Sequence, residues 1–201
     1  MRVHRSGGLT SCSKGDEKMR KLFWMSALLL AAVPLLGWSQ TGRAPYAGQE
    51  LRQIKSLSDE EVRAYLDGRG MGLAKPAELN GYPGPMHVLE LAAKLELSED
   101  QRARTQKAFE EMRAEAVRLG RLIVGKEADL NRAFAEGKVD ANGLQQAVAE
   151  IARLQGELRV AHLRAHLTVK SLLSPRQVKR YDELRGYGVK EGGPHQGHGK
   201  H

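Results

Sequence analysis

Apolar side chains recur at three- and four-residue steps over two long stretches of the chain, residues 98–136 and 141–172. This spacing places them on one face of an α-helix. The apolar positions are Phe109, Met112, Ala116, Leu119, Ile123, Leu130 and Phe134 in the first stretch, and Leu144, Val148, Ile151, Leu158, Val169 and Leu172 in the second. Gly137 ends the first helix and Asp140 caps the second, so the short connection makes the two helices antiparallel. The pattern predicts a long helical hairpin.

Three Ser-x-x-Glu/Gln boxes mark the starts of further helices, because the serine and the third residue after it each satisfy a free backbone N–H. They are Ser58–Glu61, Ser98–Gln101 and Ser174–Gln177. We expect a short helix from the first box to Gly68, another over residues 86–95, and a last one from Pro175 to Leu184. Residues 69–85 are rich in Gly and Pro and are predicted to be an ordered connector or an extended arm. The fold class is therefore all-α, an antiparallel hairpin with shorter flanking helices.

One hairpin of this length leaves an apolar face uncovered. Pairing with a second copy is the simplest way to cover that face. The sequence therefore predicts a homodimer.

The N-terminal part has the pattern of an export signal. Met19-Arg20-Lys21 is positive, residues 22–36 are almost continuously apolar, and small residues follow at Gly37 and Ser39. The alternative is an uncleaved membrane anchor, although the apolar run is near the lower limit for spanning and contains Pro34. Either way the remainder is predicted to be periplasmic. The expected organisation is an extension and signal (1–39), an arm (40–85), a hairpin domain (86–188) and a His-rich disordered tail (189–201).

Composition narrows the function. Aromatic residues make up only 5%, which disfavours a sheet-rich core, and the single cysteine excludes an internal disulfide framework. The net charge of +8 is partly carried by the segment that export would remove. The remaining bias is mild, so no nucleic-acid partner is expected. The sequence has no phosphate-binding loop, nucleophile elbow or HExxH motif, so we expect no enzyme.

His162 and His166 are the residues that point most directly to chemistry. They are four residues apart, so on a helix both project from one face within reach of one metal ion. His162 falls on the line of Leu144 and His166 on that of Val148, within the apolar stripe. The alternative is a pair of core or interface histidines, each donating to a backbone carbonyl.

Other donors are candidates to complete this site. His87 lies on the short helix before the hairpin, which can fold back toward His162, and Glu90 and Glu115 are candidate oxygen ligands. A nitrogen-rich set of this kind suits zinc, nickel, cobalt or copper, with zinc as the first candidate. Each of these residues also has an ordinary surface role. The tail histidines His195, His198 and His201 either collect metal weakly or only add solubility.

Two segments carry a family resemblance. Leu97-Ser98-Glu99-Asp100-Gln101 and Leu173-Ser174-Pro175-Arg176-Gln177 resemble the paired LTxxQ motifs of the Spy/CpxP-like periplasmic proteins, with Ser in place of Thr. Together with the hairpin and the histidine pair, over about residues 86–188, the chain resembles the CnrX/ZraP-like branch of heavy-metal sensor and resistance proteins.

The resemblance implies a ligand set and a function. His87, Glu115, and His162 with His166 match that branch's metal positions, except that His166 replaces a methionine and a second early histidine is missing. The implied function is reversible binding of a divalent transition metal by an exported homodimer, with a membrane regulatory protein as a further partner. The alternative is an ATP-independent chaperone for unfolded client proteins. Imidazole ligands must be neutral, so metal affinity should fall below about pH 6.5.

Overall fold

The computed structural model describes residues 44–187 and consists of helices joined by turns. A 3₁₀ turn, η1 (Gln49–Leu51), is followed by three short helices, α2 (Asp59–Leu66), α3 (Lys75–Glu78) and α4 (Pro85–Glu90). The long helices are α5 (Glu99–Ala135) and α6 (Ala141–Leu172), and α7 (Pro175–Arg185) completes the described part. Among residues 44–187, no helix is long and apolar enough to cross a membrane. The predicted signal, Cys12 and the tail histidines lie outside the described residues.

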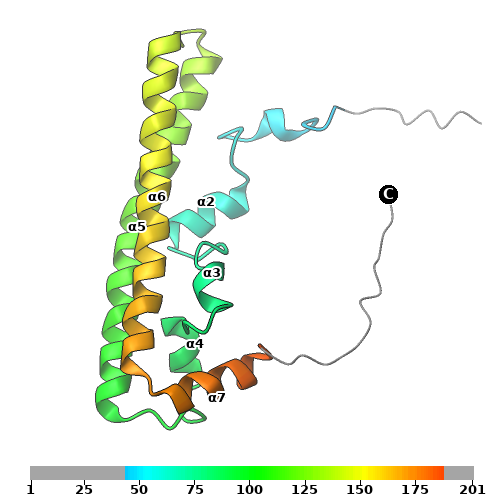
Figure 1. Cartoon of the computed structure of the whole chain (residues 1–201). Coiled ribbons are helices and arrows are strands. Elements are labelled where there is room, and N and C mark those ends of the chain that lie inside the picture. Colours follow the sequence, from blue (N-terminus) through cyan, green and yellow to red (C-terminus); the bar gives the residue numbers. More distant parts are fainter. Residues whose placement is uncertain (1–43, 188–201) are drawn as a thin grey trace, which may run out of the picture. The chain divides into compact units, whose positions relative to one another are not determined.

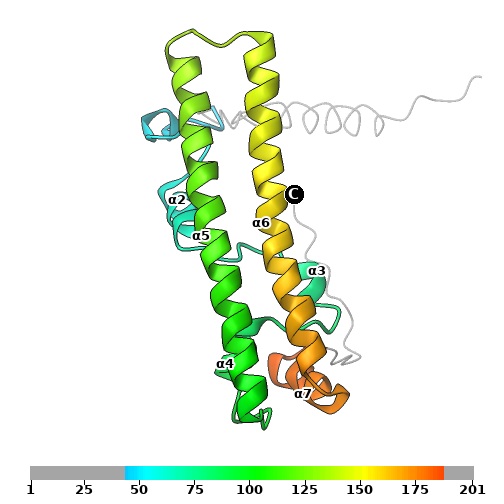
Figure 2. The same cartoon turned by 90° about the vertical axis from the view of Figure 1, so that its left-hand side faces the viewer.

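Helices α5 and α6 run antiparallel side by side, which confirms the predicted hairpin (Figure 2). At 37 residues, α5 is about 55 Å long, given the rise of about 1.5 Å per residue in an α-helix. Gly137 takes the left-handed backbone (φ +63°) after α5, and the Asp140 carboxylate accepts the Gly143 backbone N–H at the start of α6. Both ends of the predicted turn are therefore where the sequence places them.

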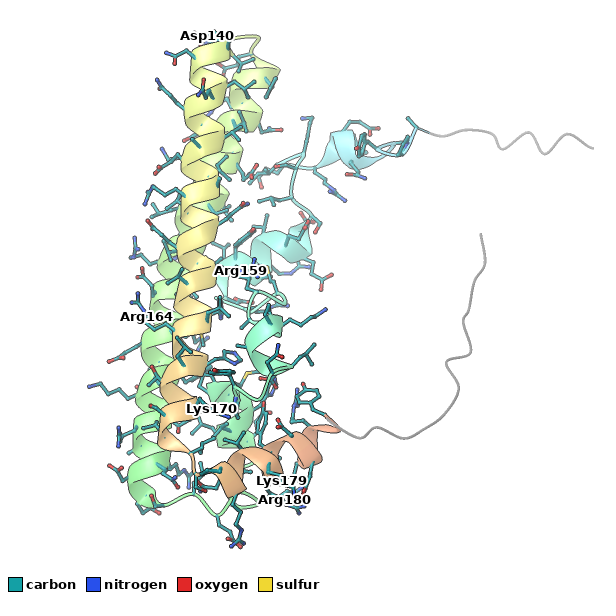
Figure 3. The ribbon with its side chains drawn as sticks, in the orientation of Figure 1. Asp140, Arg159, Arg164, Lys170, Lys179 and Arg180 are labelled. Atoms are coloured by element: carbon teal, nitrogen blue, oxygen red, sulfur yellow. The ribbon has the colours of Figure 1, made fainter. Side chains whose placement is uncertain are left out.

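The short helices all lie along one side of the hairpin, as Figure 1 shows for α2, α3, α4 and α7. α2 packs on α5, α4 on both long helices, and α3 on α6. We call residues 46–90 the arm. The Lys170 ammonium, on α6, is directed toward the arm (Figure 3) and donates to the Gly81 carbonyl at 2.6 Å. From Tyr46 onward, the described residues belong to one compact unit.

Two hydrophobic clusters hold the arm and α7 against the hairpin. One, near the base, joins α4, α5, α6 and α7 and includes the fully buried Val88, Val169 and Tyr181. The other lies between α5 and α6 under α2, around Leu119, Ile123 and Leu158. Here Gly120 is required, because a Cβ at this position would lie 2.1 Å from the Tyr65 carbonyl oxygen.

The second and third capping boxes contact each other at the base. The Gln101 amide donates to the Leu172 carbonyl at 2.8 Å and to the Gln177 side-chain oxygen at 2.9 Å. The Gln177 amide donates in return to the Leu95 carbonyl at 3.2 Å and to Gln101 at 3.0 Å. This glutamine pair, Gln101 and Gln177, ties the start of α5 to the start of α7.

The structure corrects one detail of the sequence prediction and refines another. The helix expected over residues 86–95 ends at Glu90, and the residues that follow form turns, with Glu96 in a left-handed backbone (φ +51°). The segment expected to be an ordered connector or an extended arm, residues 69–85, contains the helix α3, which is too short for a periodic pattern to reveal. Part of the apolar stripe stays exposed, as expected for a single hairpin: Phe134, Leu144 and Val148 remain 57%, 36% and 49% exposed near the far end.

Candidate metal centre

A cleft of about 950 Å³ lies between the arm and the hairpin. Its walls come from the loop after α2, from α3 and α4, from α5 around Met112, and from α6 through His162 and His166; Arg185 and Tyr187 also line it. His87 lines the same cleft. The structure thus brings the three histidines predicted from the sequence to one cavity.

His166 is held in a defined orientation. Its Nδ1 lies 2.7 Å from the Tyr82 carbonyl oxygen. A carbonyl only accepts, so Nδ1 carries the proton and, in the neutral ring, Nε2 keeps its lone pair. The residue is buried (9% exposed), and a Cβ on Gly84 would lie 3.3 Å from Nε2. A metal-ligating histidine is oriented in this way by a carbonyl or carboxylate. The same contact also satisfies the alternative of a core histidine.

His162 lacks the partner that this alternative requires. It is only 5% exposed, and its Nε2 is a buried nitrogen with no hydrogen-bond partner among the described residues. Burial, and secondarily the neighbouring His166, lower the pKa of His162 below its usual value. The ring is therefore neutral at physiological pH. An unsatisfied buried polar nitrogen is costly unless something else binds it.

His87 and Glu115 have different surroundings. His87 Nδ1 lies 3.0 Å from the Glu90 carboxylate, so two of the predicted candidates contact each other, but Glu90 does not line the cleft. Glu115 is paired instead with Arg118 through contacts of 2.8 and 2.6 Å, and it does not line the cleft. The hydrogen bond from Arg118 lowers the pKa of Glu115. Within residues 44–187, no group of three or more His, Cys, Asp or Glu side chains is positioned to hold a metal ion.

The comparison with protein families decides the relationship. The model of the family described as "Heavy-metal resistance" matches residues 62–180, which is more than half of the chain. The chain belongs to the heavy-metal resistance family. Neither a curated protein nor a solved structure matches it.

The family match covers both walls of the cleft. It begins within α2, so this heavy-metal resistance domain includes most of the arm, which precedes the motifs and hairpin that carry the sequence resemblance. His87, Glu115, His162 and His166 all lie inside the matched range. The arm that orients His166 is thus part of the family's domain.

Sequence reasoning missed Glu78, which connects the cleft of this heavy-metal resistance protein to α7. Its carboxylate accepts from Tyr181 (2.5 Å), Tyr187 (3.3 Å) and the Gly84 backbone N–H (3.1 Å). It also lies 3.7 Å from both Arg185 Nε and His166 Nδ1. Burial, followed by the Glu78 contact, raises the pKa of Tyr181, which stays a donor. No motif marks Glu78, since it lies in the Gly- and Pro-rich segment.

Sequence reasoning also did not consider sulfur at this cleft. Met71, Met86 and Met112 line it beside the histidines. Met112 was assigned only to the apolar stripe of α5. The sequence held one clue: of the six methionines in the chain, three precede residue 40, so only the three that line this cleft remain in the rest of the chain.

Proposed function

We propose that this member of the heavy-metal resistance family is an exported protein that binds a transition-metal ion reversibly through His162 and His166. Its role is the sensing or sequestration of metal rather than catalysis. Export to the periplasm is supported by the signal-like pattern of residues 19–39. The two imidazoles, with His87 nearby, form a nitrogen-rich set of donors that suits zinc, nickel, cobalt and copper.

One observation carries the proposal: the buried His162 Nε2 has no partner, one helical turn from a histidine whose Nε2 lone pair is left free. A core that had no ligand to bind would leave His162 with an uncompensated polar nitrogen. An ion between the two rings satisfies both nitrogens at once. The Tyr82 carbonyl would then act as the orienting contact behind His166.

The proposal is tested by titrating the chain with zinc, nickel, cobalt and copper(II), using isothermal calorimetry. The background carries Ala at His195, His198 and His201, so that the tail cannot supply imidazoles. We expect sub-micromolar binding of at least one ion and its loss in His162→Ala, His166→Ala. Glu115→Gln is the matched control, because Glu115 lies outside the cleft. Equal affinity with and without the two histidines would refute the proposal, provided that circular dichroism shows the variant folded.

The dimer also belongs to this proposal. Phe134 and Val148 are exposed near the far end of the hairpin, and Leu122, Val160 and Leu167 are exposed elsewhere on the two long helices. A second copy would remove these side chains from water. Sedimentation equilibrium tests this directly: a monomer at micromolar concentrations would exclude the homodimer.

Chaperone activity is the second candidate, and the same exposed side chains favour it. Flexible clients bind apolar surface flanked by charge, here the arginines and lysines of the long helices. We expect suppression of client aggregation that is independent of metal and weakens with salt. If one dimer per client molecule does not suppress aggregation, this candidate is eliminated.

A further inference from the structure

The cleft collects all the soft donors of the described chain. Residues 44–187 contain three methionines and three histidines, and all six line this one cavity: Met71, Met86, Met112, His87, His162 and His166. The methionines come from three elements, namely the loop after α2, α4 and α5, and the buried histidine pair comes from α6. Thioethers from separate elements therefore surround the same space as the imidazoles.

Two of these methionines are not placed for packing. Met71 and Met86 are 41% and 47% exposed. Met71 also takes a left-handed backbone (φ +42°), which is unfavourable for a non-glycine residue. A methionine that packs in a core would be buried, and a turn residue chosen for its backbone would be Gly or Asn. Neither core packing nor backbone conformation therefore explains why Met71 and Met86 are methionines at the wall of the cleft.

The donors and the charge of the cleft select the kind of ion. Thioether sulfur is a soft donor that favours Cu(I), whereas the usual protein ligands of zinc are thiolate, imidazole and carboxylate. The cleft is lined by four basic residues (Arg69, Lys75, Arg113 and Arg185) against two acidic ones (Asp67 and Glu78). Both carboxylates already contact an arginine, Arg69 at 3.0 Å from Asp67 and Arg185 at 3.7 Å from Glu78. A singly charged ion is therefore better compensated at this cleft than a divalent one.

We infer that the cleft binds monovalent copper, Cu(I), between the Nε2 atoms of His162 and His166 and the thioethers of Met71, Met86 and Met112. This rests on the proposed function, since it uses the same histidine pair, and it adds the identity of the ion and the sulfur ligands. Within residues 44–187, no three His, Cys, Asp or Glu side chains are grouped so that they could hold an ion, and in this proposal sulfur completes the coordination.

An apolar peptide is the competing occupant, because methionine-lined grooves also bind amphipathic segments. A peptide that covered the cleft would bury the Lys75 and Arg113 side chains, which have no carboxylate partner among the described residues. Cu(I) satisfies the nitrogen and leaves these side chains in water.

The experiment is an anaerobic competition for Cu(I) against a chromophoric chelator, with the full chain in a Cys12→Ser, His195→Ala, His198→Ala, His201→Ala background. The test variant adds Met71→Leu, Met86→Leu and Met112→Leu, which preserve side-chain volume. We expect one equivalent of Cu(I), bound at least about tenfold more weakly in the triple variant, or about 1.4 kcal/mol. Copper-edge X-ray absorption should show sulfur neighbours that the variant loses. Zinc affinity, measured in parallel, should change by less than about twofold, because thioethers are not among the usual ligands of zinc.

The outcomes separate the two proposals. Unchanged Cu(I) affinity and no sulfur neighbour in the wild type overturn the inference, even if His162→Ala, His166→Ala still abolishes metal binding. Loss of Cu(I) in the methionine variant but not in the histidine variant overturns the proposed function and leaves a sulfur site. If the triple variant binds Cu(I) like the wild type but loses affinity for a fluorescent unfolded client, the cleft is a polypeptide site and the inference is wrong.

Discussion

The half of the hairpin that the arm covers and the half beyond it are built from the same helices but are packed differently. In the covered half, Leu119 and Ile123 of α5 are fully buried, and α6 buries a residue at almost every turn from Ile151 on. Between residues 124 and 150, which include the turn at Asp140 (Figure 3), no residue is buried. There the arm contacts α5 through hydrogen bonds of Ser56 with Glu127 and of Lys55 with Asn131.

The difference shows that two helices alone do not make an interior in this protein. A core forms only where α2, α4 or α7 supplies a third layer, and the metal-binding candidates lie in that region. The far half presents apolar side chains with no covering layer in the described chain. Stability and the candidate site are therefore properties of the covered half, while the far half is the region available to a second copy or a client.

The largest contrast is expected from the same substitution in each half. Leu119→Ala removes a fully buried side chain, and large-to-small changes of this kind cost about 3 kcal/mol. Leu144→Ala, at 36% exposure, should cost less than about 1 kcal/mol. Urea denaturation followed by circular dichroism measures both. If Leu144→Ala is as costly as Leu119→Ala and its effect grows with protein concentration, the far half is covered by a second copy.

Alanine substitutions at two glycines of the long helices should change the free energy of unfolding in opposite directions. Gly120→Ala forces a Cβ against the Tyr65 carbonyl, and overpacking of this kind costs about 2 kcal/mol. Gly156→Ala meets nothing within 4 Å, so alanine should stabilise α6 by up to about 1 kcal/mol through helix propensity. Thermal melts of the two variants check this. A Gly120→Ala variant as stable as the wild type would mean that α2 is not held against α5 in solution.

The glutamine pair should be more sensitive than the isolated capping box of α2. Gln101→Glu removes the amide that donates to Leu172 and Gln177, leaving acceptors opposed, at an expected cost of about 1–2 kcal/mol. Glu61→Gln is the matched control, since either residue can complete a capping box; it should change stability by less than about 0.5 kcal/mol. Similar costs for the two variants, by chemical denaturation, would show that the contact between the boxes contributes nothing.

The smallest expected effect is a gain in stability at Asp182. One of its carboxylate oxygens is buried without a partner in the described chain, and burial raises the pKa of Asp182. The folded state then binds the proton more tightly than the unfolded state, so this contribution to stability decreases as pH rises above about 3.8. Asp182→Asn should therefore be more stable than the wild type at pH 7 by less than about 1 kcal/mol. The advantage should vanish near pH 3, in urea melts recorded across that range.

Sequence patterns predicted the parts of the fold that depend on local chemistry. The capping serines, Gly137 and Asp140 placed the helix ends because each acts on its own backbone. Burial along the stripe was not predictable in the same way, since Phe134 and Val148 repeat with the same period as Leu119 and Ile151. Whether such a residue is buried depends on how far the arm extends along the hairpin, and nothing in the pattern of α5 or α6 records that length.

The candidate site was likewise predictable only where it depends on local spacing. The spacing of His162 and His166 predicted that they share a face, and the structure places them, with His87, at one cleft. The orientation of His166 depends on the Tyr82 carbonyl, 84 residues away in sequence, and the Glu78 carboxylate lies 3.7 Å from the same ring nitrogen. Contacts over such separations arise from the path of the arm. The metal ligand set remains a prediction.

The hydrogen bonds of the glutamine pair have a consequence for how such chains are recognised. Both amide hydrogens of Gln101 and of Gln177 are engaged, and each side-chain oxygen accepts from its own serine N–H and from the other glutamine. No donor or acceptor of the pair is left over for an ion or a client. Two proteins can therefore share both motifs and still carry different cargo, or none. The motifs therefore describe how the base of the molecule is closed and carry no information about what it binds.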